Sequence, residues 1–380
     1  MPEAVIVDAV RSPIGRAYKG SLRNERPDDV GGYVIDQLMR RNPAVPRESV
    51  EDVICGCGLP DGEQGFNLGR ILALTGNLGV TVPGTTITRY CASSLQSIRM
   101  AAHAIWSGEG DTFIAAGVEF ISRYPKREDH RNPRFLVEGA PEIYISMGLT
   151  AENVAERFGI SREDQDAYAK RSQDLAVESQ RNGFFDREIV PIPLSDGTVM
   201  TKDDGPRPNT TLEVLATLKP AFKEGGTVTA GNSCPLNDGA AAVLVMSDTR
   251  ARELGLKPRA RIVASAVTAL DPAIMGVGPI EAVRAVLKRA RMTLDDVDIV
   301  ELNEAFAAQV LAVQRALDIP LEKLNPFGGA IALGHPYGMT GARIMCTLLN
   351  GLETRDQTVG LETMCVGGGQ GMAMIVERLN

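Results

Sequence analysis

A cysteine at the start of an expected helix is the first residue whose position suggests chemistry. Residues 85–88 are mostly β-branched and indicate a strand, whereas the apolar residues from Leu95 onwards recur at helical spacing. Cys91 therefore falls at a strand-to-helix turn, where unpaired N–H groups and the positive end of the helix dipole converge. We expect them to lower the pKa of its thiol from roughly 8.5 towards 7.5 or below, which favours a nucleophile. The alternative is a small buried cysteine without function.

Two further stretches carry side chains suited to acid–base chemistry. His335 lies in the glycine-rich run 328–341, where the backbone can approach a ligand closely. It is either a catalytic base or a turn histidine without function. Cys365 ends an expected strand and is followed by the glycine run 367–369, which lacks the Lys-Ser/Thr ending of a phosphate loop. This leaves a second thiol beside backbone N–H groups that could form an oxyanion hole.

Asn303 follows an expected strand at 297–302 and opens an expected helix at 303–317. It is either a plain N-cap or a residue that holds a water in an active site. The other histidines are expected to be structural in the case of His103 and solvated in the case of His130.

The elements around these residues predict an α/β fold of stacked layers, because strands alternate with helices. Strands are expected at 5–10, 53–55, 112–117, 240–246, 260–267, 358–364 and 371–376, and helices at 28–39, 67–74, 280–290 and 341–349. Between about 118 and 238 the chain is more polar, with expected helices at 150–158 and 162–182, and we interpret it as an insertion. The later part repeats the element order of the first part, which indicates a weak internal duplication.

Composition excludes several classes of protein. The 380 residues carry a net charge of −8, which is not the footprint of a nucleic-acid-binding protein. No apolar run approaches the ~18 residues that span a bilayer, and no signal peptide is apparent, so we expect a cytoplasmic protein with no membrane partner. The six cysteines are too scattered for a disulfide scaffold, and the pair Cys55 and Cys57 lacks further zinc ligands, so no metal site is expected.

Taken together, the stretches around Cys91, Asn303, His335 and Cys365 resemble the thiolases, which make or cleave the bond between carbons 2 and 3 of a 3-ketoacyl-CoA. The similarity covers essentially the whole chain, including 7–13, 149–155, 228–232 and 365–369. The resemblance implies two similar α/β halves, each with a five-stranded sheet between helices, and an inserted α-rich loop domain that binds coenzyme A. On this chain the halves would be 1–118 plus 239–268, and 269–380, with the insertion at 119–238.

The resemblance also implies roles for individual residues. Cys91 resembles the nucleophile that takes the acyl group, and His335 the base that activates it. Cys365 is similar to the acid/base that moves a proton to or from the acetyl carbon. Asn303 resembles the residue that fixes a water in one oxyanion hole, and the N–H groups of Cys91 and Gly367 resemble a second hole. A soft thiolate nucleophile and a near-neutral proton donor suit thioester and carbanion chemistry.

Residues expected to contact the substrate are less uniform. Cys234 stands where the family usually has a pantetheine-contacting serine, Ser146 replaces a histidine of the small biosynthetic thiolases, and Tyr337 replaces a common Ile or Leu. Arg207 matches a family residue near the CoA nucleotide or is an ordinary surface arginine. The set expected to bind substrate is Arg207, Ser233, Cys234, Met147 and Phe306.

The resulting expectation is a degradative thiolase that cleaves 3-ketoacyl-CoAs larger than acetoacetyl-CoA through an acyl group on Cys91. Coenzyme A is a substrate, and no cofactor is expected. The resemblance suggests a homodimer or homotetramer. A biosynthetic acetoacetyl-CoA thiolase and an inactive CoA-binding paralogue are the alternatives, although the second would be expected to lose Cys91, His335 or Cys365. Decarboxylating ketoacyl synthases are disfavoured because they have a second histidine in place of Cys365. Sterol-carrier-type thiolases are disfavoured because their His-Asp-Cys-Phe run is not found at 303–306.

Overall fold

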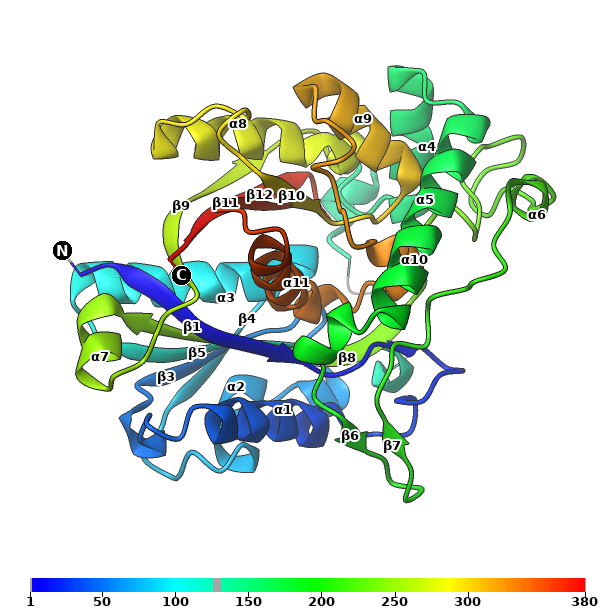
Figure 1. Ribbon diagram of the computed structural model, residues 1–380. Coiled ribbons are helices and arrows are strands. Elements are labelled where there is room, and N and C mark those ends of the chain that lie inside the picture. Colours follow the sequence, from blue (N-terminus) through cyan, green and yellow to red (C-terminus); the bar gives the residue numbers. More distant parts are fainter. Residues whose placement is uncertain (1, 126–130, 380) are drawn as a thin grey trace.

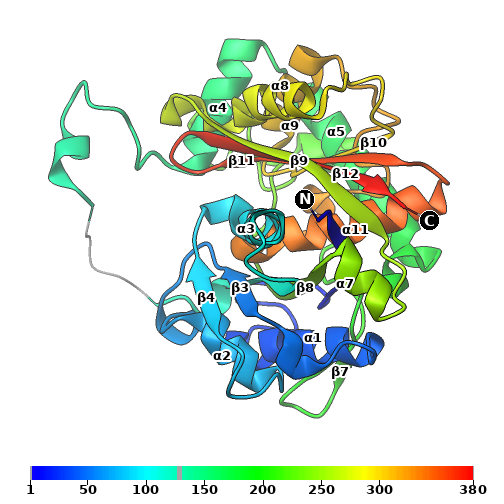
Figure 2. The ribbon, with the colours of Figure 1, turned by 90° about the vertical axis from the view of Figure 1, so that its left-hand side faces the viewer.

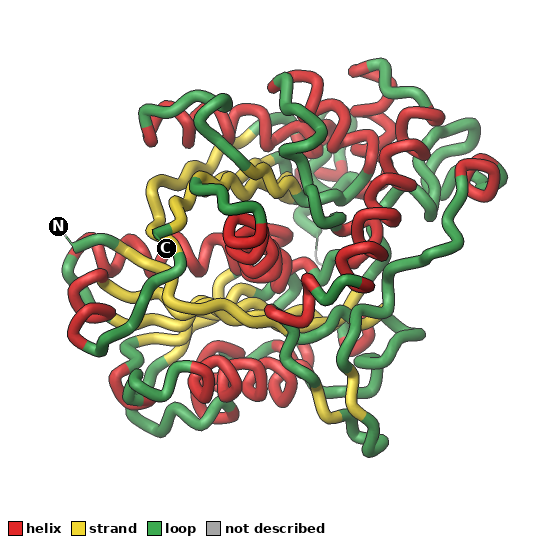
Figure 3. The backbone as a smooth tube through the Cα atoms, viewed as in Figure 1, coloured by secondary structure: helices red, strands yellow, loops and turns green. Residues whose placement is uncertain are grey.

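The computed structural model describes residues 2–125 and 131–379. Five layers, alternately helical and β, form its body (Figure 1). From one outer face to the other they are α1 (Pro27–Arg41) with α2 (Leu68–Thr75), a first group of strands, α3 (Ser93–Ser107) with α11 (Thr340–Thr354), a second group of strands, and α8 (Gly278–Ala290) with α9 (Ala307–Leu317). Figure 3 shows the two groups of strands in yellow with the central helices between them. The α/β expectation is confirmed.

The first group of strands has the order β1-β8-β5-β3-β4. Its members are β1 (Ala4–Arg11), β8 (Asn237–Ser247), β5 (Thr112–Phe120), β3 (Asp52–Gly56) and β4 (Gly84–Ile87). β3 pairs in parallel with β4 and β5, as helix-connected strands do, whereas β8 runs antiparallel to β1 and β5. The short β2 (Gly15–Arg16) also pairs with β8. This group has the five long strands that the resemblance implied.

The second group has the order β9-β12-β11-β10. Its members are β9 (Ala260–Ala269), β12 (Gln370–Arg378), β11 (Val359–Val366) and β10 (Ile299–Leu302). Within the described residues this half has these four strands rather than the five implied by the resemblance. Two residue pairs, Val5 with Arg261 and Ile6 with Ala260, link β1 to β9 and join both groups into one sheet.

The predicted domain boundaries stay a prediction, but one of them cuts across the observed pairing. The sequence placed residues 260–268 in the first half. In the structure β9 pairs with β12 from Ala260 to Ala269 and meets β1 at only two positions. Strand character alone does not tell which sheet a strand joins, because the choice depends on partners distant in sequence.

The central helices α3 and α11 are enclosed by both groups of strands. Their apolar side chains, among them Leu95, Ile98, Ile344 and Leu348, share one buried cluster with residues from both sheets. Separate clusters lie under α1 and α2 and under α8 and α9. The N-terminal turns of α3 and α11 approach very closely, since a Cβ on Gly341 would lie 2.3 Å from the backbone N of Leu95.

The inserted segment flanks the layers. It contains α4 (Met147–Phe158), α5 (Arg162–Arg181), α6 (Leu212–Ala216), and the small pair β6 (Ile192–Pro193) and β7 (Val199–Met200). Ser161 caps α5 as predicted, because its side chain accepts a hydrogen bond from the N–H of Asp164 at 3.1 Å. Figure 2 shows that the stretch around Pro133–Leu136 reaches away from the body. The remaining short helices are α7 (Asp248–Glu253) and α10 (Ala330–Leu333).

Candidate active site

Cys91 lies at the turn that the sequence predicted. β4 ends at Ile87, a single 3₁₀ turn spans Tyr90–Ala92, and α3 begins at Ser93. Tyr90 has a φ of 45°, in the left-handed region, so the backbone is sharply bent immediately before the cysteine. The N–H groups of Gly367 and of Cys91 itself both donate towards the Cys91 sulfur. The turn therefore presents a thiol against two backbone donors.

The expected lowering of the Cys91 pKa is wrong for the protein without substrate. Burial dominates and raises the pKa of this thiol to about 12, and the negative charge of Glu119 acts in the same direction. The two N–H donors oppose this shift without overcoming it. The helix terminus favours the thiolate, but the loss of water around the sulfur disfavours this charged form more strongly.

His335 is buried between α10 and α11, and two hydrogen bonds hold it in place. Its backbone N–H donates to Asn237 at 3.0 Å, and its Nδ1 lies 2.6 Å from Thr340 Oγ1. Because the Thr340 hydroxyl already donates its proton to the carbonyl of Pro336 at 2.9 Å, it must accept from His335. Nδ1 therefore carries the ring proton, and Nε2 keeps its lone pair, which faces the amide nitrogen of Asn303 at 3.4 Å.

The unprotonated Nε2 of His335 is the atom that could take a proton from a nucleophile. Burial lowers the pKa of the imidazole to about 3, and the positive charge of Arg343 adds to this effect. The residues that follow His335 pack against the turn that carries Cys91. In the protein without substrate, Cys91 and His335 are therefore a neutral thiol and a neutral imidazole.

Asn303 does not begin a helix, so both the predicted helix start at 303 and the N-cap interpretation are wrong. Residues 303–306 follow β10 without helical structure, and α9 begins only at Ala307. Phe306 instead bridges to Ser233 on the inserted segment, a contact that local helical spacing cannot reveal. Asn303 Nδ2 lies 3.4 Å from His335 Nε2, while its buried Oδ1 has no protein partner. Such a polar atom is suited to a water or a ligand.

Cys365 lies near the end of β11 and is fully buried. Burial raises the pKa of its thiol well above the usual value, and the nearby Cys91 and Cys234 add to the shift. It packs in one apolar cluster with Phe306, against which Met147 and Cys234 also pack. The fold thus brings together four site residues from separate stretches of the sequence: Cys365, Phe306, Met147 and Cys234.

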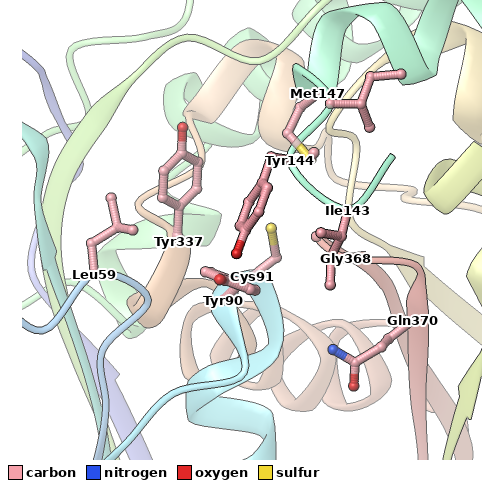
Figure 4. Close-up of a pocket in the computed structure, with 11 residues that line it drawn as sticks. Leu59, Tyr90, Cys91, Ile143, Tyr144, Met147, Tyr337, Gly368 and Gln370 are labelled. Carbon is pink, nitrogen blue, oxygen red and sulfur yellow. The ribbon is translucent and has the colours of Figure 1, made fainter. Parts of the chain in front are cut away.

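A cavity of about 490 Å³ opens above the Cys91 sulfur (Figure 4). Tyrosine rings and aliphatic side chains make up most of its wall, and Gly367, Gly368 and Gln370 form one side. Tyr337, noted in the sequence for its position after His335, lines the same cavity, with its ring edge-on to His335 at 5.1 Å. The other lining residues are Leu59, Tyr90, Ile143, Tyr144, Ile145 and Met147.

Of the five residues expected to bind substrate, Met147 lines this cavity, whereas Arg207, Ser233, Cys234 and Phe306 are not part of its wall. Arg207 is exposed on the inserted segment, where its backbone N–H donates to Gln173. Ser233 is buried, and its hydroxyl donates to the carbonyl of Thr229 at 2.7 Å, so it already has a partner. Their expected contacts with CoA stay predictions.

Glu119 is a residue that the sequence analysis missed. Its buried carboxylate accepts hydrogen bonds from the N–H groups of Gly58, Leu59 and Gly338, and from the amide of Gln64. It therefore ties one wall of the cavity to the turn after His335, while burial raises its own pKa to about 7. A lone glutamate inside the strand Thr112–Phe120 was the available signal, because a buried charge requires partners.

Other predicted features were less informative. His103 lies on the exposed side of α3 beside Trp106, and His130 falls outside the described residues. Within 2–125 and 131–379 no group of three or more His, Cys, Asp or Glu side chains is arranged as metal ligands. Among the helices of those residues, none has both the length and the apolar character needed to cross a bilayer.

Comparison with known proteins gives matches along the whole chain. Residues 4–249 match the family model described as thiolase, N-terminal domain, and residues 256–378 match that of thiolase, C-terminal domain. The 3-ketoacyl-CoA thiolase of Bacillus subtilis is 45% identical over 390 residues, covering 99% of this chain and 100% of that protein. A beta-ketoadipyl-CoA thiolase of Acinetobacter baylyi is 47% identical over 402 residues, with 100% of both chains covered. The crystal structure of human mitochondrial 3-ketoacyl-CoA thiolase in complex with CoA superposes with a TM-score of 0.92 at 36% identity, covering 100% of this chain and 98% of that one.

Proposed function

This chain belongs to the thiolase family of acyltransferases, and from that premise we propose that it cleaves 3-ketoacyl-CoAs with CoA by way of an acyl group on Cys91. The single observation that carries the proposal is the position of the Cys91 sulfur. It lies at the floor of the cavity and receives the N–H groups of Gly367 and Cys91. A carbonyl oxygen brought to the sulfur would meet the same two donors as negative charge develops on it.

The first half of the reaction needs a base for Cys91. In our proposal His335 Nε2 takes the thiol proton as the sulfur attacks carbon 3 of the substrate, because both groups are neutral beforehand. The new imidazolium keeps its Nδ1–H bond to Thr340, which strengthens when the donor becomes charged. Asn303, with its unpartnered Oδ1, is positioned to hold a water near the thioester oxygen.

The second thiol completes the proton balance. When the bond between carbons 2 and 3 breaks, its electron pair stays on carbon 2, and the Cys365 thiol gives that carbon a proton to release acetyl-CoA. The incoming CoA thiol returns a proton to Cys365, and its sulfur attacks the acyl group on Cys91 to give the shortened acyl-CoA. Cys91 leaves as a thiolate and recovers its proton from the His335 imidazolium, which restores both starting groups. The shared apolar cluster of Cys365, Phe306, Met147 and Cys234 supports this role, because a dry wall protects a carbanion from water.

We propose a degradative role with substrates larger than acetoacetyl-CoA. Ser146 is smaller than the histidine of the biosynthetic enzymes and is followed by Met147 on the cavity wall. Each methylene of a longer acyl chain that is buried there contributes about 0.8 kcal/mol. The names of the B. subtilis and A. baylyi relatives, and the CoA complex of the human structure, support CoA thioesters as substrates. A homodimer or homotetramer in the cytoplasm completes the proposal.

Mass spectrometry after incubation with an acyl-CoA tests the nucleophile. The peptide that contains Cys91 should gain the acyl mass, and Cys91→Ser should abolish the rapid adduct. An adduct confined to Cys55, Cys57 or Cys234 would overturn the assignment. Measuring kcat/KM for thiolysis along a series of chain lengths then tests the substrate. A steady fall from acetoacetyl-CoA upwards would favour the biosynthetic alternative, and absence of turnover with every member would favour the inactive paralogue.

A further inference from the structure

Three ionisable side chains are enclosed between the second group of strands and α11. Glu301 on β10 and Glu362 on β11 are opposite each other in the parallel pairing, and each is at most 1% exposed. They share a sheet face with Ile299 and Met364, which pack in the apolar cluster around the central helices. Arg343, in the first turn of α11, is equally buried, and its positive charge acts on both carboxyls. Glu301, Glu362 and Arg343 therefore form a buried triad.

The buried triad lacks the hydrogen bonds that buried polar groups normally have. In the part of the chain that the structure describes, no partner is found for Glu301 Oε1, for either oxygen of Glu362, or for Nε and Nη1 of Arg343. Such atoms are costly to bury, and apolar side chains of similar size would pack here without that cost. Charge is the property that the triad brings to this part of the core and that apolar residues would not.

The other charged groups around the triad already have partners. Glu188 binds Arg11 at 2.6 Å and accepts hydrogen bonds from two side chains of α11. Glu304 accepts from two hydroxyl groups of α5, at 2.8 and 2.6 Å, and Arg171 donates to two backbone carbonyls. Among the described residues, the two carboxyls of the triad are thus the ones left to balance its guanidinium.

The triad lies next to both residues that contact the His335 ring. Thr340, which accepts from His335 Nδ1, is one helical turn before Arg343 on the same face of α11. Asn303, at 3.4 Å from His335 Nε2, follows Glu301 by two residues where the chain leaves β10. The positive charge of Arg343 reaches the ring and lowers the pKa of His335. Without a counter-charge, Arg343 would therefore oppose the formation of an imidazolium.

The triad is electrically balanced when one of its carboxyls is ionised and the other is protonated. A guanidinium stays charged in proteins, so Arg343 requires one negative charge. Burial raises the pKa of both carboxyls, and two adjacent carboxylates repel each other, which disfavours a second ionisation. We propose that Glu301 and Glu362 share one proton and one negative charge opposite Arg343, and that this charge stabilises the imidazolium of His335 during acyl transfer. They are positioning residues, and the inference rests on the proposed transfer of the Cys91 proton to His335.

A purely structural role for the triad makes a different prediction. If the three side chains only fill space, each replacement lowers activity by its own factor, the factors multiply, and a further replacement adds damage. A shared charge behaves otherwise, because either carboxyl can carry it alone. Only the loss of both leaves the guanidinium uncompensated, and removing the guanidinium then repairs the defect.

The kinetic test measures kcat/KM for thiolysis of 3-oxohexanoyl-CoA by the full-length protein. Glu301→Gln and Glu362→Gln should each retain kcat/KM within about threefold of the wild type, because the remaining carboxyl takes the negative charge. The double variant should lose about tenfold or more, since Arg343 then acts on His335 without a counter-charge.

Two further variants separate charge from shape. Adding Arg343→Met to the double variant should restore most of the lost kcat/KM, because the triad is then neutral again. The matched control is Glu178→Gln with Glu253→Gln, which removes two carboxylates that are more than half exposed and should leave kcat/KM unchanged. Urea unfolding of each variant shows whether a loss of activity reflects a loss of stability instead.

Infrared difference spectra count the protons on the triad without any substrate. At neutral pH the wild type should show the carbonyl band of one protonated carboxyl, and this band should vanish in Glu301→Gln and in Glu362→Gln alike, because the remaining carboxyl ionises. A band that persists in either single variant, or no difference between wild type and double variant, would overturn the inference while leaving the thiolase activity intact. Kinetic losses that multiply, or that Arg343→Met worsens, would do the same. If the wild type cleaves no thioester, the proposed function fails and the infrared band decides the inference; the single variants suffice for this readout even if the double variant does not fold.

Discussion

Replacing Thr340 by valine tests whether the position of one proton on His335 matters. The side chain is fully buried and keeps its shape when the hydroxyl becomes a methyl group. The change removes the acceptor of His335 Nδ1–H at 2.6 Å and leaves the carbonyl of Pro336 without its donor at 2.9 Å. Without the hydroxyl, no hydrogen bond at Nδ1 holds the His335 ring in its orientation or favours the tautomer with the proton on Nδ1.

The size of the effect follows from the charge on the ring. Leaving a buried donor unpaired costs about 1–3 kcal/mol, so the free energy of unfolding should fall by that amount. Hydrogen bonds of a charged donor are roughly twice as strong as those of a neutral one. The state with imidazolium therefore loses about 1–2 kcal/mol more than the resting state, and at ~1.36 kcal/mol per tenfold kcat/KM should fall about 5- to 30-fold.

The assay is steady-state thiolysis together with urea unfolding, and Thr340→Ser is the matched control. Serine keeps the hydroxyl, so it should retain kcat/KM within about threefold of the wild type, since only a methyl group is lost. If Thr340→Val kept full activity while its stability fell, the hydroxyl would serve the fold alone. If serine and valine were equally damaging, packing rather than the hydrogen bond would explain the loss.

Three other outcomes follow from the site. Burial raises the pKa of Cys91 to about 12 and lowers that of His335 to about 3, so both groups stay neutral between pH 5 and 9. The rate at which iodoacetamide alkylates Cys91 should therefore rise steadily with pH over this range. A rate that levels off, with a midpoint near pH 7, would contradict this. Cys365→Ala should still be acylated on Cys91 but lose thiolysis by ~10²–10⁴-fold, as expected for a positioned proton donor, and near wild-type turnover would make Cys365 a structural residue. Gly341→Ala places a Cβ 2.3 Å from the backbone N of Leu95 and should lower the free energy of unfolding by about 1–3 kcal/mol, measured by thermal or urea unfolding. An unchanged stability would mean that α3 and α11 can move apart without a cost in free energy.

Local patterns predicted most of the elements, because each is written in a few neighbouring residues. The strand before Cys91 and the helix after it show opposite apolar periodicities, and the turn between them follows from that switch. The Ser161 cap was likewise a local signal. The apolar faces of α3 and α11 also follow from the spacing of apolar residues along each helix. That spacing does not predict that the two helices pack against each other.

What the sequence could not supply depends on partners distant in the chain. Residues 303–306 stay outside the helix where Phe306 bridges to Ser233, and helical spacing in the sequence carries no trace of that bridge. The Cys91 pKa was predicted in the wrong direction because burial is a property of the whole fold. Glu119 and Thr340 became visible only once their hydrogen-bond partners were placed around them.

The central layer has a consequence for how this protein is made. α3 is synthesised early, whereas α11, which covers it, leaves the ribosome much later. Until then the apolar side chains that α3 shares with α11 have no cover, and exposed apolar surface of this kind makes nascent chains prone to aggregate. A chain interrupted before residue 340 would hold Cys91 on a helix without its neighbour. Cutting the chain between the two matched family regions, at 250–255, would therefore yield two pieces that need each other to fold.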